Sequence, residues 1–342
     1  MEKTVSSKRF KKRKLYPIEE YYAVVDPMEI NKIRVDIYYP PKTLSQRKEA
    51  YKKHKKTILR LKPLFKKVMR YHESIAKEQG FKDYVELILK SDGVEKNKVE
   101  HFFKNVDVVI KDLNKNFPIP KNVPSWYWSK FNVPDPLDWV DRNKYLIPDD
   151  VYNMAEKMKP GIKKILDRIK IINDVDYLYP HSSAKYEKNT KSVSINIAAG
   201  ERRIYGLLSF VHELGHAISM LKLADRGLDL NKKSKFWHEK QAYKFKFEFE
   251  EKCLPEKTKN ASRGEIFGNF LTAFFQYGIY TNSNQDFDKL YAEAINRCYP
   301  GKPKQKSNPF YVLENGLIYR PGGAITSSIV QAELLLKHSK NV

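Results

Sequence analysis

Two histidines four residues apart, His212 and His216, enclose Glu213 in the second half of the chain. On a helix, side chains four positions apart lie one turn above each other, so the two imidazoles would face a single opening. Two neutral imidazoles at this spacing can bind one metal ion, typically zinc. Glu213 would lie beside the same opening, where a carboxylate can take the proton of a water molecule that attacks a carbonyl group. The three residues therefore predict metal-assisted hydrolysis, with Glu213 as the catalytic base.

The residues around this pair have the pattern of a helix buried on one face. Between Ile204 and Met220, apolar side chains recur at intervals of three and four. They are Leu207, Leu208, Val211, Leu214 and Ile218. Gly215 leaves room for a close neighbour, and the small Ala217 follows the second histidine. This setting favours a metal site over the alternative that the two histidines only pack or cap a helix.

A third metal ligand must come from elsewhere in the chain, because a catalytic zinc site usually has three protein ligands and one position for water. Two glutamates stand near the start of predicted helices, Glu239 in 236–253 and Glu265 in a helix that begins near Ser262. Either carboxylate would complete the site. His238 is a weaker candidate beside Glu239. The residues alone leave the choice between the two glutamates open.

Strict alternation of polar and apolar residues predicts a β-strand at 192–197, shortly before the metal-binding helix. The free edge of such a strand can pair with an extended peptide and hold its carbonyl group near the metal. An ordinary hairpin strand is the alternative interpretation.

The chain has 342 residues and a formal net charge of +23, with a basic cluster at 8–14. This charge fits nucleic acid, an anionic membrane or acidic peptides as partners, although lysines spread along helices are more typical of solvated faces. The two cysteines, Cys253 and Cys298, form neither a disulfide framework nor a Cys-x-x-Cys site. No apolar run has the length of a membrane span or the pattern of a secretion signal. We therefore expect a cytoplasmic protein that does not enter the membrane.

The rest of the pattern is mainly helical. Helices are predicted at 45–79, 94–114, 148–172 and 324–336, with another beginning at Tyr84, and 27–41 is predicted to be extended. Four regions follow from these patterns: a basic flexible arm at 1–16, an N-terminal helical lobe at 17–116, a crossing segment rich in proline and aromatic residues at 117–147, and the catalytic zinc-binding lobe at 148–342.

Three features of the chain resemble the mostly helical gluzincin peptidases, represented by oligoendopeptidase F and thimet oligopeptidase. Residues 75–84 resemble the Ala-x-x-x-Gly-Phe-x-x-Tyr segment that precedes the catalytic lobe in that family. Residues 210–218 are very similar to the family's metal-binding helix. Glu239 follows His212 by 27 residues, close to the family spacing for its third ligand. The resemblance extends from about residue 60 to residue 336, and angiotensin-converting enzyme is a more distant relative.

This resemblance implies zinc bound by His212, His216 and Glu239, with Glu213 as the base. It also implies a mainly α, two-lobed helical peptidase fold, with a small β-sheet edge beside the metal-binding helix and a deep channel that admits short, unfolded peptides. The implied activity is that of a zinc-dependent metallopeptidase that hydrolyses peptide bonds of oligopeptides.

Hydrogen-bond donors from the C-terminal region steady the tetrahedral intermediate in these relatives, and Tyr311 and Tyr319 are the nearest matches here. The chain departs from the family pattern in three respects. It is much shorter than typical members, the His-x-x-x-Tyr pattern near the C-terminus is not intact, and Glu239 lacks the usual following serine.

A second resemblance points to a different third ligand. The segment 262–267 is similar to the Glu-x-Phe helix of the anthrax lethal factor-like peptidases, which implies Glu265. Those enzymes also use a tyrosine one or two turns before that glutamate, and 256–264 contains none, so we favour Glu239. Two other functions stay open: a metal-dependent carboxypeptidase, and a basic nucleic-acid-binding protein with a structural or inactive metal site.

Overall fold

The computed structural model describes most of the chain. The described residues are 17–24, 29–30, 32–33, 36, 43–115, 148–174, 182–198, 204–282, 284–300, 304–313, 317–318 and 322–339. The predicted basic arm at 1–16, the crossing segment at 117–147 and Tyr319 lie outside these residues.

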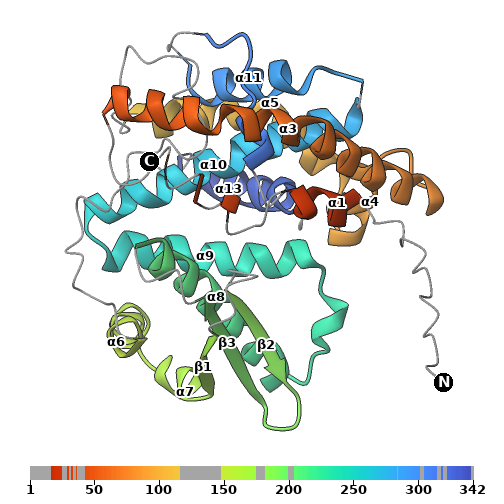
Figure 1. Ribbon diagram of the computed structural model, residues 1–342. Helices are drawn as coiled ribbons and strands as arrows, with labels where there is room; N and C mark the ends of the chain where they lie inside the picture. Colours follow the sequence, from red (N-terminus) through yellow and green to blue (C-terminus); the bar gives the residue numbers. More distant parts are fainter. Residues whose placement is uncertain are drawn as a thin grey trace, which may run out of the picture.

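The described helices form two layers, with one helix between them (Figure 1). The upper layer contains α1 (Pro17–Val24), α3 (Leu44–Glu78), α4 (Tyr84–Asp92), α5 (Lys96–Lys115), α10 (Glu256–Thr281), α11 (Phe287–Cys298), α13 (Gly323–Ser339) and the 3-10 turn η4 (Phe310–Leu313). The lower layer contains α6 (Pro148–Met158), α7 (Lys163–Leu166), a small sheet and α8 (Ile204–Asp225), which is followed by the 3-10 turn η3 (Leu230–Lys232). Helix α9 (Lys235–Cys253) lies between the layers. The predicted mainly helical fold is confirmed.

Local sequence signals determine the ends of the long helix α3. Thr43 caps its N-terminus, because the Thr43 hydroxyl accepts a hydrogen bond from the backbone N–H of Gln46 while the Gln46 side chain bonds back to Thr43. The helix ends before Gly80, whose φ of 80° is a conformation that glycine adopts without a steric penalty. The predicted helix at 45–79 is therefore confirmed almost to the residue.

The single helix predicted at 148–172 is wrong. Helix α6 stops at Met158, and the chain turns through Pro160 and Gly161, whose φ is 86°. After the short helix α7, the chain enters strand β1 (Ile169–Asp174). Proline and a left-handed glycine end helices, and the isoleucines that follow favour a strand.

The extended structure predicted at 27–41 is also wrong for the residues that the structure describes there. Glu29, Ile30, Lys32, Ile33 and Asp36 are helical. Ile30 and Ile33 are both buried, and a separation of three residues places them on one helical face.

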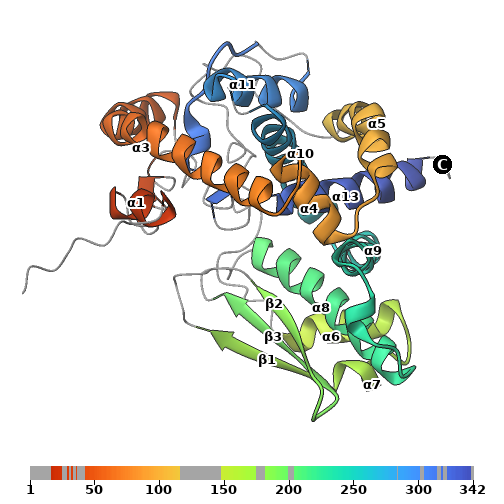
Figure 2. The same cartoon turned by 90° about the vertical axis from the view of Figure 1, so that its right-hand side faces the viewer.

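The lower layer contains a three-stranded sheet in the order β1-β3-β2. Strand β3 (Ser192–Ala198) pairs in parallel with β1 and antiparallel with β2 (Ser183–Glu187). The strand predicted at 192–197 is thus confirmed, but its predicted free edge is wrong, because β3 is central and the edges belong to β1 and β2. Figure 2 shows α8 packed along this sheet, where it contacts β2 and β3.

Two hydrophobic cores correspond to the two layers. One core joins α1, α3 and α5 to α10, α11 and α13, and the other joins α6, α7, β1 and β3 to α8. Helix α9 contributes to both, with Phe236 and Tyr243 in the first core and Phe245 and Phe249 in the second. The C-terminal helices α10, α11 and α13 thus share one core with the N-terminal helices. Among the described residues, no helix has the length and apolar character needed to cross a bilayer.

Candidate metal centre

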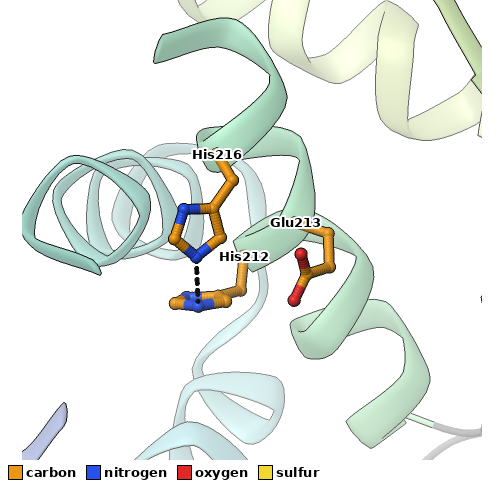
Figure 3. A group of neighbouring side chains, drawn as sticks. All are labelled: His212, Glu213 and His216. Atoms are coloured by element: carbon orange, nitrogen blue, oxygen red, sulfur yellow. Dashed lines mark hydrogen bonds between the residues drawn. The ribbon is translucent and has the colours of Figure 1, made fainter. Parts of the chain in front are cut away.

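Helix α8 brings the two histidines together as their spacing predicts. The Nε2 atoms of His212 and His216 are 3.1 Å apart, and the imidazole rings are perpendicular (Figure 3). Glu213 lies beside the pair on the same helix, and ligand atoms of all three residues lie within 4.8 Å of one another. The rings thus direct two nitrogen atoms at one point, with a carboxylate next to it.

A second carboxylate reaches the same point from helix α9. One oxygen of Glu239 is 3.4 Å from Nε2 of His212, and its other oxygen is 3.8 Å from Nε2 of His216. Glu239 lies in the second turn of α9, whose N-terminus is capped by the Ser234 hydroxyl. The cap starts the helix at the position that directs Glu239 towards the histidines.

The separations of these donor atoms fit a tetrahedral ion. With metal–ligand bonds of about 2.0–2.1 Å, two ligands of a tetrahedral zinc lie about 3.3 Å apart. The observed separations of 3.1, 3.4 and 3.8 Å are all close to this value. Two imidazoles and one carboxylate also form the donor set of many hydrolytic zinc sites, which leave a fourth position for water.

Gly215 permits the close approach of the two helices that carry these donors. A Cβ atom at Gly215 would lie 2.8 Å from Cα and 2.9 Å from the carbonyl oxygen of Ala242 on α9. Real Cβ atoms essentially never come so near to other heavy atoms, so any larger residue would push the helices apart. Glycine at this position therefore allows Glu239 to reach the histidines.

The charges at the centre depend on one another. Burial acts to raise the pKa of Glu239, but the hydrogen bond to His212 and the charges of both histidines lower it to about 2. Burial, with the nearby charge of His212, lowers the pKa of His216 to about 4. Burial also acts to lower the pKa of His212, but the hydrogen bond and charge of Glu239 outweigh it and raise that pKa. Glu239 is thus an ionised carboxylate and His216 a neutral imidazole, the forms that bind a metal.

The three donor side chains are largely but not completely buried. Those of His212, His216 and Glu239 are 15%, 11% and 18% exposed. This partial exposure leaves the centre within reach of water and of a small part of a substrate.

Contacts from the upper layer hold the first half of α9 in place. Asp92 at the end of α4 accepts hydrogen bonds from Lys235 on α9 and from Thr326 on α13. In the second turn of α9, Nζ of Lys240 donates a hydrogen bond of 2.7 Å to the carboxylate of Glu333 on α13. Helices α4 and α13, which are far from Glu239 in the sequence, therefore hold the part of α9 that carries this predicted third ligand.

Glu265 has a different set of contacts. Helix α10 begins at Glu256 rather than near Ser262, so Glu265 lies in its third turn and not at its start. Its carboxylate accepts a hydrogen bond from Lys246 at 2.5 Å, and the Lys246 side chain is completely buried. Glu250 is 3.7 Å from the same ammonium. Glu265 thus balances a buried positive charge, and no described contact joins it to either histidine.

Of the two predicted oxyanion donors, only Tyr311 lies in the described part of the chain, and its contacts are in the upper layer. Tyr311 packs against aromatic rings of the upper core, including Phe65 and Phe275, and its hydroxyl donates to Asp288 at 3.1 Å. No described contact brings Tyr311 to the histidines, and its catalytic role stays a prediction. Nε2 of His238, the weaker ligand candidate, is 3.3 Å from the carbonyl oxygen of Leu230.

One residue at the centre was missed in the sequence. The ring of Tyr243 lies against that of His212, with centroids 4.4 Å apart. Burial, followed by the charges of Glu265 and Glu239, raises the pKa of Tyr243 well above its usual value, so it remains a neutral phenol. The available signal was its position four residues after Glu239, which places both on one face of α9.

Comparison with known proteins places this geometry in a known architecture. No model of a protein family and no curated protein sequence matches the chain. Among solved structures, an oligoendopeptidase F matches 95% of the chain with a TM-score of 0.63 and 14% identity. Pz peptidase A, crystallised with an inhibitor, matches 95% of the chain with a TM-score of 0.60 and 15% identity. The fold is that of the oligoendopeptidases.

A third similar structure, an oligoendopeptidase F from Bacillus anthracis str. Ames, matches 92% of the chain with a TM-score of 0.53 and 15% identity. The chain spans 66% of the length of each of the first two relatives and 60% of the third. The predicted resemblance is therefore confirmed at the level of the fold. Identities this low carry the architecture and not the activity.

Proposed function

We propose that the protein is a zinc-dependent metallopeptidase that hydrolyses peptide bonds of oligopeptides. The observation that carries this proposal is the convergence of three donor groups, from His212, His216 and Glu239, at separations of 3.1–3.8 Å beside the carboxylate of Glu213. The oligoendopeptidase fold supports it independently.

In the proposed reaction, His212, His216 and Glu239 hold the ion. When bound, zinc polarises the peptide carbonyl and makes a water molecule acidic enough to react at neutral pH. Glu213 accepts the proton of the attacking water and then delivers it to the nitrogen of the leaving amine. The C–N bond breaks as that nitrogen is protonated, so one carboxylate moves the proton in both halves of the reaction.

Peptides are the proposed substrates for two reasons. The similar structures are named as oligoendopeptidases and a peptidase, and both names denote enzymes that act on peptides. Among the described residues, β1 and β2 each pair with another strand on one side only, and an unpaired edge can bind an extended chain through main-chain hydrogen bonds.

The substitution Glu213→Gln tests the proposal. The amide keeps the size of the side chain but cannot accept the proton, so zinc content should stay at the wild-type level while peptide turnover falls by about 100-fold or more. Zinc by atomic absorption and cleavage of a fluorogenic peptide library measure the two quantities. Glu293→Gln, on an exposed residue of α11, is the matched control and should keep full activity. Near-normal turnover by Glu213→Gln would refute the role of this base.

Two alternative functions, nucleic-acid binding and carboxypeptidase activity, can be tested with the same purified protein. Helix α3 carries twelve Lys and Arg and three Glu in its 35 residues, which favours an anionic partner as the second candidate. Salt-sensitive binding of RNA or DNA by wild-type protein that cleaves no peptide would replace the peptidase proposal. A carboxypeptidase would release single residues from the end of a long peptide, and an endopeptidase would release internal fragments.

A further inference from the structure

The orientation of His212 needs an explanation beyond its place on α8. A histidine that binds a metal through one ring nitrogen usually donates its other N–H to a carboxylate, a carbonyl group or water, which fixes the ring. In the part of the chain that the structure describes, Nδ1 of His212 and Nδ1 of His216 are buried and have no hydrogen-bond partner. No side chain or carbonyl group of these residues therefore fixes the ring through a hydrogen bond.

The ring of Tyr243 occupies the position from which it can fix His212 by packing. Its centroid is 4.4 Å from that of the imidazole, and the two planes are inclined by 55°. Tyr243 is 5% exposed, so the contact is sheltered from water. An imidazole that turned about its side-chain bonds would collide with this ring, and the collision restricts the directions in which Nε2 can point.

Tyr243 is itself held at several points. Its ring contacts Phe247 with centroids 5.9 Å apart. The Lys246 ammonium lies 5.7 Å from the ring centroid, where it attracts the aromatic face. A buried ring with these two contacts can act as a rigid stop.

The position of Tyr243 in the chain joins it to the third donor. Tyr243 lies four residues after Glu239, so one face of α9 presents both the carboxylate and the aromatic ring to α8. A movement of α9 would displace the two together.

We propose that Tyr243 is a positioning residue that aims Nε2 of His212 at the metal through ring packing. This inference rests on the metal site of the proposed function. A tyrosine that served only the hydrophobic core would stabilise the fold without changing the affinity of the centre for metal.

Zinc affinity, measured by competition with a chromogenic chelator, tests the inference. Tyr243→Leu should weaken zinc binding about 10- to 100-fold, the usual effect of losing a group that orients a metal ligand. Tyr243→Phe keeps the ring and should bind zinc within about threefold of wild type. Tyr291→Leu removes another buried tyrosine of the upper core and should lower the melting temperature of metal-free protein without changing zinc affinity.

The outcomes separate this inference from the proposed function. Wild-type protein that fails to bind zinc refutes the metal site itself and the role of Tyr243 with it. If wild-type protein binds zinc and a folded Tyr243→Leu variant binds it with equal affinity, the metal site stands and only the positioning role of Tyr243 is refuted. If Tyr243→Leu does not fold, Tyr243→Met, which keeps more of the buried volume but has no ring, takes its place in the same chelator competition and should weaken zinc binding over the same range. A folded Tyr243→Met variant with the zinc affinity of wild type would then overturn the inference.

Discussion

The substitution Gly215→Ala tests whether the close approach of α8 and α9 sets the metal centre. The added methyl group would lie 2.8 Å from Cα and 2.9 Å from the carbonyl oxygen of Ala242. Both atoms belong to the backbone of α9, so neither can be moved aside by a rotamer change. Helix α9 must retreat, and it carries Glu239 with it.

The displacement of α9 is large compared with the change in metal–ligand distance that a metal site tolerates. Ordinary contact begins at about 3.4 Å, so the helix must move by roughly 0.6 Å. Metal–ligand distances tolerate changes of only about 0.2 Å. Overpacking costs about 1–3 kcal/mol, and the better helix propensity of alanine offsets up to about 1 kcal/mol of that. The free energy of unfolding should thus change modestly, while zinc affinity should fall at least about 10-fold.

Two measurements on the same protein distinguish these effects. Urea unfolding of the metal-free form reports the free energy of unfolding, and chelator competition reports the affinity for zinc. Gly278→Ala on α10 is the matched control, because its new methyl group would meet the flexible tip of Leu290 at 2.6 Å. That side chain can rotate away, so this variant should keep its zinc affinity. A folded Gly215→Ala variant with zinc affinity within twofold of wild type would refute the reasoning.

Two further predictions concern single side chains. Glu239→Ala should yield protein largely free of zinc after dialysis, whereas Glu265→Ala should retain the metal, because Glu265 pairs with Lys246 instead; the reverse result would favour the lethal factor-like arrangement. Burial lowers the pKa of His72, stacked on Tyr84, to about 4. Because the unfolded chain binds this proton near pH 6.5, stability should fall by on the order of 3 kcal/mol as the pH drops from about 6.5 to 4. His72→Gln should flatten that part of the urea-unfolding profile, and parallel profiles for the two proteins would contradict the assignment.

Features that depend on neighbours in the sequence were predicted from the sequence. The two histidines face one opening because a helix repeats every 3.6 residues, and Thr43 and Gly80 bound α3 because capping and left-handed glycine are local effects. The same kind of reasoning failed at 148–172. There the spacing of apolar residues fits a helix, but Pro160 and Gly161 end the helix, and the isoleucines that follow belong to β1, which pairs with β3.

Only the tertiary structure shows which carboxylate lies at the centre. Both Glu239 and Glu265 were plausible in the sequence, and their distances from the histidines depend on how α9 and α10 pack. That packing in turn depends on Gly215, whose missing side chain lets two backbones touch, and on buried charges such as Lys246.

The contact of Tyr243 with His212 is also a feature that only the tertiary structure shows. From the sequence alone, the side chain of a helical tyrosine could lie in the core, on the surface or at the functional site, because its spacing from other residues predicts only the helix face on which it lies. The neighbour of that face comes from helices distant in the chain, and their arrangement minimises exposed apolar area over the whole molecule rather than over any local segment.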